Sequence, residues 1–346
     1  MGLYVDIEKK LKGMTLQVRF DTNGTEGITG ILGASGCGKS MTLKSIAGIV
    51  TPDKGRIVLN NKVLFDSQQR IDIRVQKRRV GYLFQNYALF PRMTIRENIQ
   101  IGVSGDRNRK KELCDYYMRL LRIEELADRY PTKLSGGQQQ RAALARVLAS
   151  EPEVLMLDEP FSALDAYLKE KLQMEILDVL KDFAGDILMV THSRDEVYRF
   201  CRQIHVLDMG KVVASGLTKD VFRDPVSVAA ARLTGCKNIV PVKRIGSHEL
   251  EVPEWGLLLR LEREVPEWVQ AVGIRAHYLC PAGQMEPYNV IECRWNRILE
   301  EPFEITGILD NGIWWKISKD EWHQKMAEQM PEYLRLPEES ILLLKD

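Results

Sequence analysis

The apolar residues in the first two thirds of the chain fall into short runs, separated by longer amphipathic stretches. Five runs are typical of strands buried on both faces: GITGILG (27–33), RRVGYLFQ (78–85), EVLMLDE (153–159), DILMVTH (186–192) and QIHVLDMG (203–210). Helical patterns alternate with them, for example directly after Lys39 and from Tyr167 to Phe183. This alternation predicts an α/β fold with a largely parallel central sheet.

The pattern changes after Cys236. Short strand-like stretches follow, such as HELEVPEWGLLLRLE (248–262), VQAVGIRAHYL (269–279) and GILDNGIWWKI (307–317), the last with a D-N-G turn. All six tryptophans lie beyond this point, and 13 basic against 19 acidic residues give residues 237–346 a net charge of −6, whereas residues 1–236 carry +7. We therefore expect two domains, 1–236 and 237–346, of which the second is small and mostly β.

Composition narrows the class of protein. The 346 residues are 45% hydrophobic and 28% charged, as in globular proteins, and the net charge of +1 comes without any Lys/Arg block, so we expect no nucleic-acid partner. Six scattered cysteines without a CxxC pair, and no secretory leader pattern, predict a reduced, cytosolic protein. No apolar stretch approaches the roughly 18 residues of a membrane span, so a membrane contact would go through another chain.

A glycine-rich loop joins the first apolar run to a helix. The spacing Gly33-x-x-x-x-Gly38-Lys39-Ser40 follows a strand and precedes a helical pattern, which is the context of a phosphate-binding P-loop. Glycines let backbone N–H groups curve around phosphate oxygens, Lys39 would reach the β- and γ-phosphates, and Ser40 would hold Mg²⁺. The predicted nucleotide contacts are Gly33, Ala34, Ser35, Gly36, Cys37, Gly38, Lys39, Ser40 and Met41.

Two acidic residues end the apolar run EVLMLDEP. A P-loop needs a carboxylate that holds magnesium, and Asp158 is placed for this at the end of a buried strand. Glu159 follows, where it could polarise an attacking water as a general base. The alternative is a pair of solvated acids at a strand end, but an all-apolar strand that finishes in D-E-P favours the catalytic interpretation.

A second glycine pair precedes another helix. Leu134 and Ser135 lead into Gly136, Gly137 and Gln138. Ser135 can cap the helix, and the glycines let backbone amides approach a second phosphate. The sequence LSGGQ resembles the signature of the ATP-binding cassette (ABC) ATPases, in which two chains sandwich two ATP molecules. The resemblance implies that residues 135–138 contact the ATP bound by a second copy of the chain, arranged head to tail.

The resemblance extends over most of residues 1–236, with the motifs in the family's order. Gln85 in YLFQNYALFP matches the Q-loop glutamine, which contacts Mg²⁺ and the attacking water, SALD (162–165) matches the D-loop, and His192 in MVTHS matches the switch histidine. The resemblance implies an ATPase with Lys39, Gln85, Glu159 and His192 as catalytic residues and with Mg²⁺ held by Ser40, Gln85 and Asp158.

One element of the family is missing. ABC ATPases usually place an aromatic side chain near the turn between their first two strands, where it stacks on adenine, but here that connection reads EKKLKG (8–13). Neither Tyr4 nor Phe20 stands at the expected place. The residue that contacts the base is therefore left unassigned.

Spacing separates the kinds of ABC protein. Lys39 and Ser135 are 96 residues apart without heptads between them, which excludes the DNA-repair and chromosome-structuring relatives, and single copies of each motif exclude chains with two cassettes. Exporters usually fuse a membrane domain, which is not found here. The chain resembles an importer subunit on the cytoplasmic face of the membrane, bound to an integral-membrane permease that works with an external solute-binding protein. Residues 87–150 would form a helical subdomain facing the permease, with Phe90, Pro91 and Met93 as contact candidates.

The solute is inferred from resemblance alone. The stretches KRRVGYLFQNYALFPRMTIRENI (77–99) and LTGCKNIVPV (233–242) are most similar to the molybdate/tungstate and sulfate importer ATPases. This implies molybdate, with sulfate, ferric iron, sugar or polyamine as alternatives, while a regulatory ATP-binding protein without transport is the competing class. Residues 237–346 resemble an OB-like (TOBE/MOP-type) β domain, which would either sense a cytosolic oxyanion or only stabilise a dimer.

Overall fold

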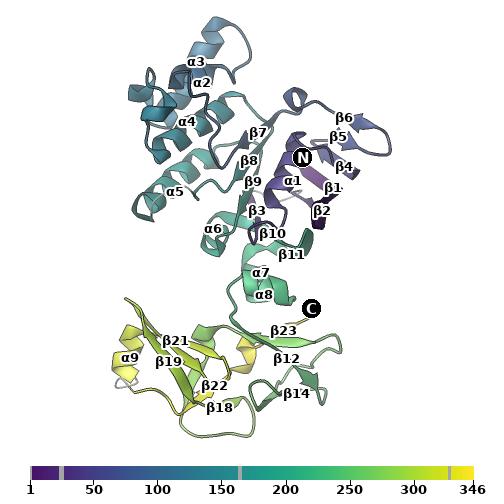
Figure 1. The fold of residues 1–346 in the computed structure, drawn as a ribbon, viewed down its shortest axis with the longest axis vertical. Helices are drawn as coiled ribbons and strands as arrows, with labels where there is room; N and C mark the ends of the chain where they lie inside the picture. Colours follow the sequence, from purple (N-terminus) through teal and green to yellow (C-terminus); the bar gives the residue numbers. More distant parts are fainter. Residues whose placement is uncertain (1, 23–26, 163–165, 326–328) are drawn as a thin grey trace. The chain divides into compact units, whose positions relative to one another are not determined.

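A computed structural model describes residues 2–22, 27–162, 166–325 and 329–346. Contacts divide the chain into two compact units, Met1–Lys219 and Asp220–Asp346 (Figure 1). Within the described residues, no helix has the length and apolar character needed to cross a lipid bilayer.

The five apolar runs form neighbouring strands of one sheet in the first unit. They are β10 (Cys201–Asp208), β3 (Ile28–Gly33), β9 (Asp186–Thr191), β8 (Val154–Asp158) and β7 (Val80–Leu83), in that spatial order. Each neighbouring pair is parallel, and every residue of β3 and β8 is buried, as the uninterrupted runs predicted. The predicted α/β fold is confirmed. Because the carboxyl ends of parallel strands meet at one edge, the residues that follow these strands gather there.

Further strands extend the sheet beyond β10. They are β11 (Lys211–Leu217), β2 (Met14–Asp21), β1 (Leu3–Leu11), β4 (Lys54–Leu59), β5 (Lys62–Asp66) and β6 (Ile71–Asp72), in that order. The turn between β10 and β11 connects this part to the P-loop: the N–H of Gly210 donates to the carbonyl of Cys37 at 3.1 Å, and the Gly210 carbonyl accepts from the N–H of Gln17 at 2.7 Å. Gly210 has a φ of 81°, and a Cβ there would lie 2.5 Å from the Thr15 carbonyl oxygen, so only glycine fits.

Three helices form a group beside β7 (Figure 1). They are α2 (Ile95–Gln100), α3 (Arg107–Leu120) and α4 (Gly136–Ala149), with the 3₁₀ turns η2 (Glu124–Leu126) and η3 (Pro131–Lys133) between α3 and α4. Both α2 and α3 pack on α4, and a capping box of Thr94 and Glu97 starts α2. The whole group lies within residues 87–150, the range that the sequence assigns to a helical subdomain.

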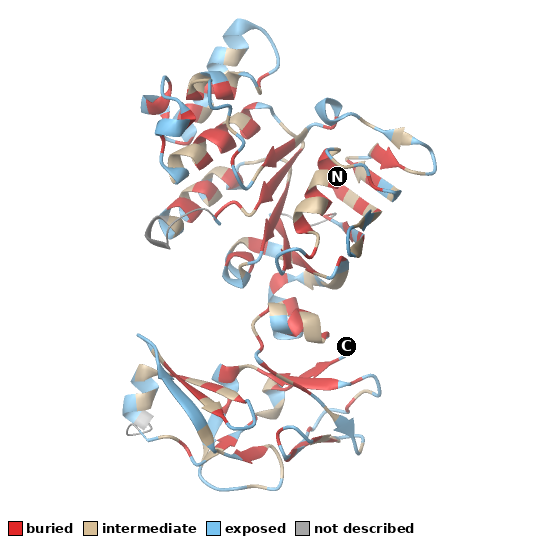
Figure 2. Cartoon of the chain, in the orientation of Figure 1, coloured by how far each residue is buried: buried red, intermediate tan, exposed pale blue. Residues whose placement is uncertain are grey.

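The remaining helices of the first unit are α1 (Lys39–Ala47), α5 (Ala166–Lys181) and α6 (Arg194–Phe200), together with the 3₁₀ turn η1 (Val75–Lys77). Helices α1 and α6 pack on the central strands, and α5 packs on α4. Leu43 and Ile46 of α1 are fully buried in the core, where each contributes about 1.5–3 kcal/mol of stabilisation. Figure 2 shows the buried positions running along the central strands. The core therefore fixes the start of α1, and with it the P-loop, against the sheet.

In the described residues of the second unit, four three-stranded antiparallel sheets surround one apolar core that contains Trp255 and Trp315. The sheets are β12 (Asn238–Pro241), β16 (Ala271–Ile274), β23 (Leu342–Leu344); β13 (Lys243–Arg244), β14 (Glu249–Val252), β15 (Leu257–Arg260); β17 (Cys280–Ala282), β22 (Tyr333–Arg335), β18 (Val290–Glu292); and β19 (Trp295–Glu300), β20 (Glu304–Leu309), β21 (Trp314–Ser318). The helices are α7 (Thr218–Arg223), which crosses the division between the units, α8 (Val228–Leu233) and α9 (Lys319–Lys325), with 3₁₀ turns η4 (Ala276–Tyr278) and η5 (Glu338–Ser340). The predicted mostly-β fold is confirmed.

The division by contacts comes before the boundary that tryptophan and charge indicated near Cys236. Cys236 is buried in one cluster with Ala231 of α8 and Leu344 of β23. Arg275 donates to the carbonyl of Thr234 at 2.6 Å, which ties the end of α8 to the same unit. Helix α8 thus packs with the β sheets although it contains no tryptophan. The assignment of separate functions to 1–236 and 237–346 stays a prediction.

Candidate functional site

The P-loop (residues 33–40) curves between β3 and α1. Gly33 ends β3 and Lys39 begins α1, so the predicted contacts 33–41 form the loop and the first helical turn. Gly38, the residue before the helix, has a φ of 112°, and a Cβ there would lie 2.6 Å from Cδ1 of Leu16. The positive φ favours glycine, and a side chain would also have to displace Leu16. Among the described residues no side chain caps α1, so its first backbone N–H groups are left for an anion.

Lys39 is almost fully buried beside this loop. Its Nζ donates to the carbonyls of Gly33 at 2.8 Å and Ala34 at 2.9 Å, and lies 3.8 Å from Oε1 of Glu159. A buried ammonium needs such acceptors and a counter-charge, because desolvation disfavours its charged form. Burial raises the pKa of the Cys37 thiol, so this side chain stays protonated at neutral pH and fills space in the loop.

Ser40 and Asp158 lie together at the carboxyl edge of the sheet. The Ser40 hydroxyl donates to Oδ1 of Asp158 at 2.8 Å, and the buried Tyr82 hydroxyl donates to Oδ2 of the same carboxylate at 2.7 Å. Burial, and then the bond to Asp158, raises the pKa of Tyr82, so it remains a donor. Sequence reasoning missed Tyr82; the available signal was a hydroxyl near the end of a strand adjacent to β8.

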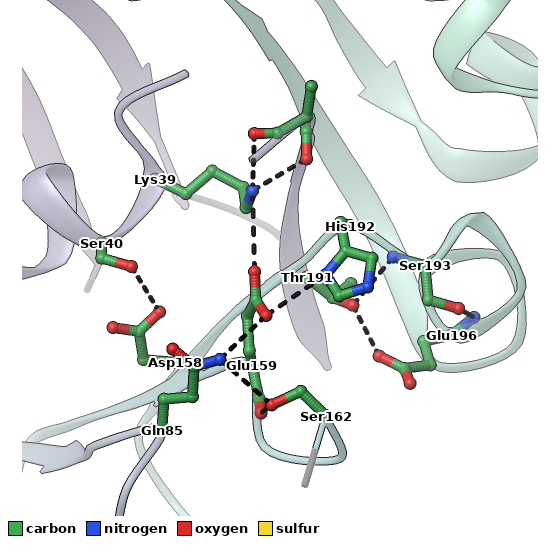
Figure 3. Close-up of polar contacts among 12 residues, drawn as sticks. Lys39, Ser40, Gln85, Asp158, Glu159, Ser162, Thr191, His192, Ser193 and Glu196 are labelled. Atoms are coloured by element: carbon green, nitrogen blue, oxygen red, sulfur yellow. Dashed lines mark hydrogen bonds and ion pairs between the residues drawn. The ribbon is translucent and has the colours of Figure 1, made fainter. Parts of the chain in front are cut away.

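Glu159 is the point where the predicted catalytic residues meet (Figure 3). Its Oε2 lies 3.2 Å from Nδ1 of His192 and accepts from Nε2 of Gln85 at 3.4 Å, while Oε1 faces Lys39. Its backbone is left-handed, with a φ of 47°, and its N–H donates to the carbonyl of Val190 at 2.9 Å. Such a conformation is uncommon for a residue with a side chain and concentrates at functional sites.

A buried network holds the turn that carries His192. Thr191 ends β9 and donates its hydroxyl to Oε2 of Glu196 at 2.6 Å, and the N–H of Ser193 donates to the Thr191 hydroxyl at 3.0 Å. Ser193 caps α6, and Lys169 pairs with Glu196 at 2.6 Å. Sequence reasoning missed Glu196, which the S-x-x-E spacing at the start of a helix could have indicated. The network fixes the backbone on both sides of the exposed imidazole.

The predicted D-loop is described only at its first residue. The Ser162 hydroxyl accepts from Nε2 of Gln85 at 3.4 Å and donates to the Glu159 carbonyl at 3.0 Å. Residues 163–165 lie outside the described part of the chain. Ser162 thus belongs to the same contact group as Gln85 and Glu159.

The LSGGQ segment forms the start of α4, as predicted. Ser135 is the N-cap, and its hydroxyl accepts from the N–H of Gln138 at 3.4 Å, while the Gln138 side chain accepts from the Ser135 N–H at 3.0 Å. In the described residues no hydrogen bond or ion pair joins residues 135–138 to the P-loop. One chain therefore brings together the P-loop, Gln85, Asp158, Glu159 and His192, but leaves Ser135, Gly136, Gly137 and Gln138 apart from them.

The two aromatics near the first strands have other contacts. Phe20 is buried with its ring centre 4.7 Å from that of His205, and the Tyr4 hydroxyl donates to Asp6 at 3.3 Å. Phe20 is therefore closed off from a base by its own packing. The adenine contact remains unassigned.

Comparison with known proteins finds close sequence relatives. The profile of the ABC transporter family matches residues 17–162. The chain is 37% identical over 247 residues to the molybdenum import ATP-binding protein ModC of Pectobacterium atrosepticum, covering 71% of this chain and 69% of that protein. It is 38% identical to the Fe(3+) ions import ATP-binding protein FbpC of Haemophilus influenzae (61% and 60% covered) and 36% identical to the spermidine/putrescine import ATP-binding protein PotA of Oleidesulfovibrio alaskensis (68% and 61%). The matches to these last two span about six tenths of their length.

Solved structures share the fold of the first unit. A dimeric ATP-binding cassette in a post-hydrolysis state, bound to ADP and Pi, superposes with a TM-score of 0.52 at 26% identity, covering 63% of this chain and 99% of that one. The cbiO1 protein of Clostridium perfringens, part of the ABC transporter complex cbiONQ, gives a TM-score of 0.53 at 28% identity, covering 64% and 91%. Both likenesses cover about the share of the chain that the first unit occupies.

Proposed function

This chain belongs to the ABC transporter ATP-binding proteins, and from that membership we propose that it hydrolyses ATP to drive import of a solute through a separate membrane permease. The observation that carries the proposal is the convergence of Lys39, Gln85 and His192 on the Glu159 carboxylate, next to the P-loop and to Asp158. In this assignment Gly33 to Met41 hold the phosphates, while Glu159 acts on the attacking water.

The donor set beside the P-loop fits Mg²⁺. Mg²⁺ is held in phosphate sites by one or two carboxylates and by substrate oxygens, and the Ser40 hydroxyl and Asp158 carboxylate supply hard oxygen ligands 2.8 Å apart. Gln85 is the third proposed ligand. The ion, when bound, neutralises phosphate charge. Tyr82 supports this site by fixing the orientation of the Asp158 carboxylate.

The protein's own groups account for the hydrolytic step. Glu159 accepts a proton from water as the water oxygen bonds to the γ-phosphorus of ATP, and the bond from that phosphorus to the bridging oxygen breaks to leave ADP. The buried Lys39 ammonium and an N–H of His192 stabilise the negative charge on the transferred group. Gln85 orients the water through its carboxamide, which already contacts Glu159 at 3.4 Å.

A second copy of the chain is the proposed source of the missing phosphate contacts. Residues 135–138 make no described bond to the P-loop of their own chain, and relatives of the first unit were solved as dimers. In the proposed head-to-tail pair, Ser135, Gly136 and Gly137 of each copy face the ATP of the other. Gln138 stays engaged in the cap of α4.

Molybdate, with tungstate as its analogue, is the proposed solute. Several relatives at 36–40% identity are named molybdenum import ATP-binding proteins, although ferric iron and spermidine/putrescine import proteins match equally well. The permease, an external solute-binding protein and a location at the cytoplasmic face of the membrane are part of the same proposal.

Reconstitution tests this function directly. The chain, its co-purified permease and binding protein would be placed in liposomes, and ATP hydrolysis measured with molybdate, tungstate, sulfate, ferric iron, maltose or spermidine outside. Stimulation by molybdate and tungstate alone supports the full proposal. Stimulation by another solute retains the importer and replaces its cargo, whereas hydrolysis that none of these solutes stimulates, with the same rate with and without the permease, would favour the regulatory alternative.

A further inference from the structure

The segment 86–93, which follows Gln85 in the sequence, begins with an unusual turn. Tyr87 has a φ of 60° and Ala88 a φ of 47°, so two consecutive residues with side chains are left-handed. Their N–H groups donate to the carbonyls of Phe84 at 2.9 Å and Asn86 at 2.7 Å. Left-handed residues of this kind persist only where surrounding contacts enforce them. The contacts that do so here come from two helices.

Arg146 of α4 provides the first contact. Its Nη2 donates to the Tyr87 carbonyl at 3.0 Å and its Nη1 to the Ala88 carbonyl at 2.7 Å, and the guanidinium lies 5.5 Å from the centre of the Phe90 ring. None of the ion pairs between described residues involves Arg146, whereas Arg141 on the same helix pairs with Glu175 at 2.5 Å. A planar, two-pronged donor suits two neighbouring carbonyls, and a lysine cannot reproduce that geometry.

Asn98 of α2 holds the other end of the segment. This fully buried side chain accepts from the Phe90 N–H at 2.7 Å. Its amide also donates to the carbonyls of Phe90 at 3.1 Å, Met93 at 3.1 Å and Thr94 at 3.0 Å. The segment after Gln85 is therefore attached to α4 at its start and to α2 at its end, and α2 itself packs on α4.

The attachment through Arg146 connects the LSGGQ segment with Gln85, two parts of the proposed site. Helix α4 begins at Gly136, within the LSGGQ segment, and Arg146 lies ten residues further along, about 15 Å at 1.5 Å per residue. At the other end of the linkage, the Gln85 carboxamide contacts Glu159 and Ser162, each at 3.4 Å. We infer that Arg146 is a positioning residue: by holding the turn at Tyr87 and Ala88, it directs Gln85 toward Glu159 and makes that contact depend on the position of the LSGGQ helix.

The inference rests on the proposed ATPase function, and a double-mutant cycle tests it in the full-length chain. The variants are Arg146→Met, Arg146→Lys, Gln85→Ala and the two combinations with Gln85→Ala, with Arg119→Met, an exposed arginine of α3, as the control for loss of a positive charge. Steady-state ATPase kinetics with Mg²⁺ give kcat and KM, and thermal unfolding identifies any variant that is not folded.

We expect Arg146→Met to lower kcat at least about tenfold with KM changed less than about threefold, because ATP binding does not use the turn. In the Gln85→Ala background the same substitution should change kcat less than about twofold, because Arg146 acts through Gln85. Arg146→Lys should recover only part of the rate. Should Arg146→Met fail to fold, the cycle with Arg146→Lys gives the same comparison.

Three results would overturn the inference. The first is that the effects of the two substitutions multiply in the double variant, which would mean that Arg146 acts independently of Gln85. The second is an unchanged kcat in Arg146→Met, and the third is an equal loss of kcat in Arg119→Met. Absence of Mg²⁺-dependent hydrolysis in the wild-type chain would instead count against the proposed function itself, so the two failures are distinguishable.

Discussion

Oε2 of Glu159 lies 3.2 Å from Nδ1 of His192. The two residues follow the neighbouring parallel strands β8 and β9, and the N–H of Glu159 donates to Val190 on β9, so the pairing of the strands itself sets the distance. An imidazole beside a carboxylate can donate to it or, when turned away, donate to a phosphate. Because this contact lies at the centre of the proposed catalytic site, replacing Glu159 is the most informative test of the site.

Glu159→Gln should abolish steady-state hydrolysis and preserve ATP binding, because an amide cannot take a proton from water. The variant should also accumulate as an ATP-bound dimer, which size-exclusion chromatography with and without ATP would detect. Glu170→Gln, at an exposed site on α5, is the matched control. Near-normal turnover, or a variant that stays monomeric with ATP, would contradict this prediction.

Tyr82→Phe should weaken the proposed magnesium site without removing a ligand. The substitution deletes the donor to Oδ2 of Asp158, and loss of a buried hydrogen bond to a charged group costs about 1.5–3 kcal/mol of folding stability. We expect a higher Mg²⁺ concentration for half-maximal ATPase activity and a lower unfolding midpoint. An unchanged Mg²⁺ titration would show that Tyr82 supports only the fold.

Nucleotide preference should be weak. Phe20 is occupied by its packing with His205, and no aromatic stands in residues 8–13, so binding energy should come mainly from phosphates. GTP should then compete with labelled ATP within about tenfold, or roughly 1.4 kcal/mol. A hundredfold preference for ATP in the competition titration would reveal a base contact elsewhere in the chain.

Acid should destabilise the first unit through His205. Burial lowers the pKa of this histidine to about 4 from its ordinary value of 6.5, against a weaker opposing effect of Asp21, so the unfolded chain binds the proton more tightly. Its contribution is fully present above pH 6.5 and is lost as the pH falls toward 4, by up to about 3 kcal/mol. Urea unfolding at pH 7 and pH 4.5 would measure the loss, which His205→Phe should reduce.

The second unit should report on anions by fluorescence. All six tryptophans lie there, and Trp315 packs with its ring centre 5.6 Å from that of Trp295 and 6.3 Å from that of Trp322. If this unit senses an oxyanion, micromolar molybdate or tungstate should change tryptophan emission and lower ATPase activity. A chain ending at Lys219 should still bind ATP but lose the inhibition. Unchanged emission and rates up to millimolar anion would leave a structural role, such as a dimer contact.

Local sequence was sufficient for the parts of the site that depend on neighbouring residues. The P-loop, the D-E pair after β8 and the capped LSGGQ helix each follow from a short run of the chain. Tyr82 was missed because its role depends on strand order, which brings it beside Asp158, 76 residues away. Glu196 was missed although its signal is local, because its partner Thr191 lies only five residues away. The boundary that composition indicates near Cys236 differs from the division by contacts after Lys219 for a reason similar to that for Tyr82. Composition changes along the sequence, whereas α8 belongs to the second unit through contacts with residues that are distant in the sequence.

The nucleotide loop depends on the turn at Gly210, which lies outside the P-loop motif. The backbone bond of Gly210 to Cys37 attaches the loop to a hairpin encoded more than 150 residues later, and its bond to Gln17 attaches the same hairpin to β2. A residue with a side chain at position 210 would clash with the Thr15 carbonyl and disturb this attachment, while every letter of GASGCGKS stayed intact. The shape of the nucleotide loop thus depends on a glycine outside its own motif.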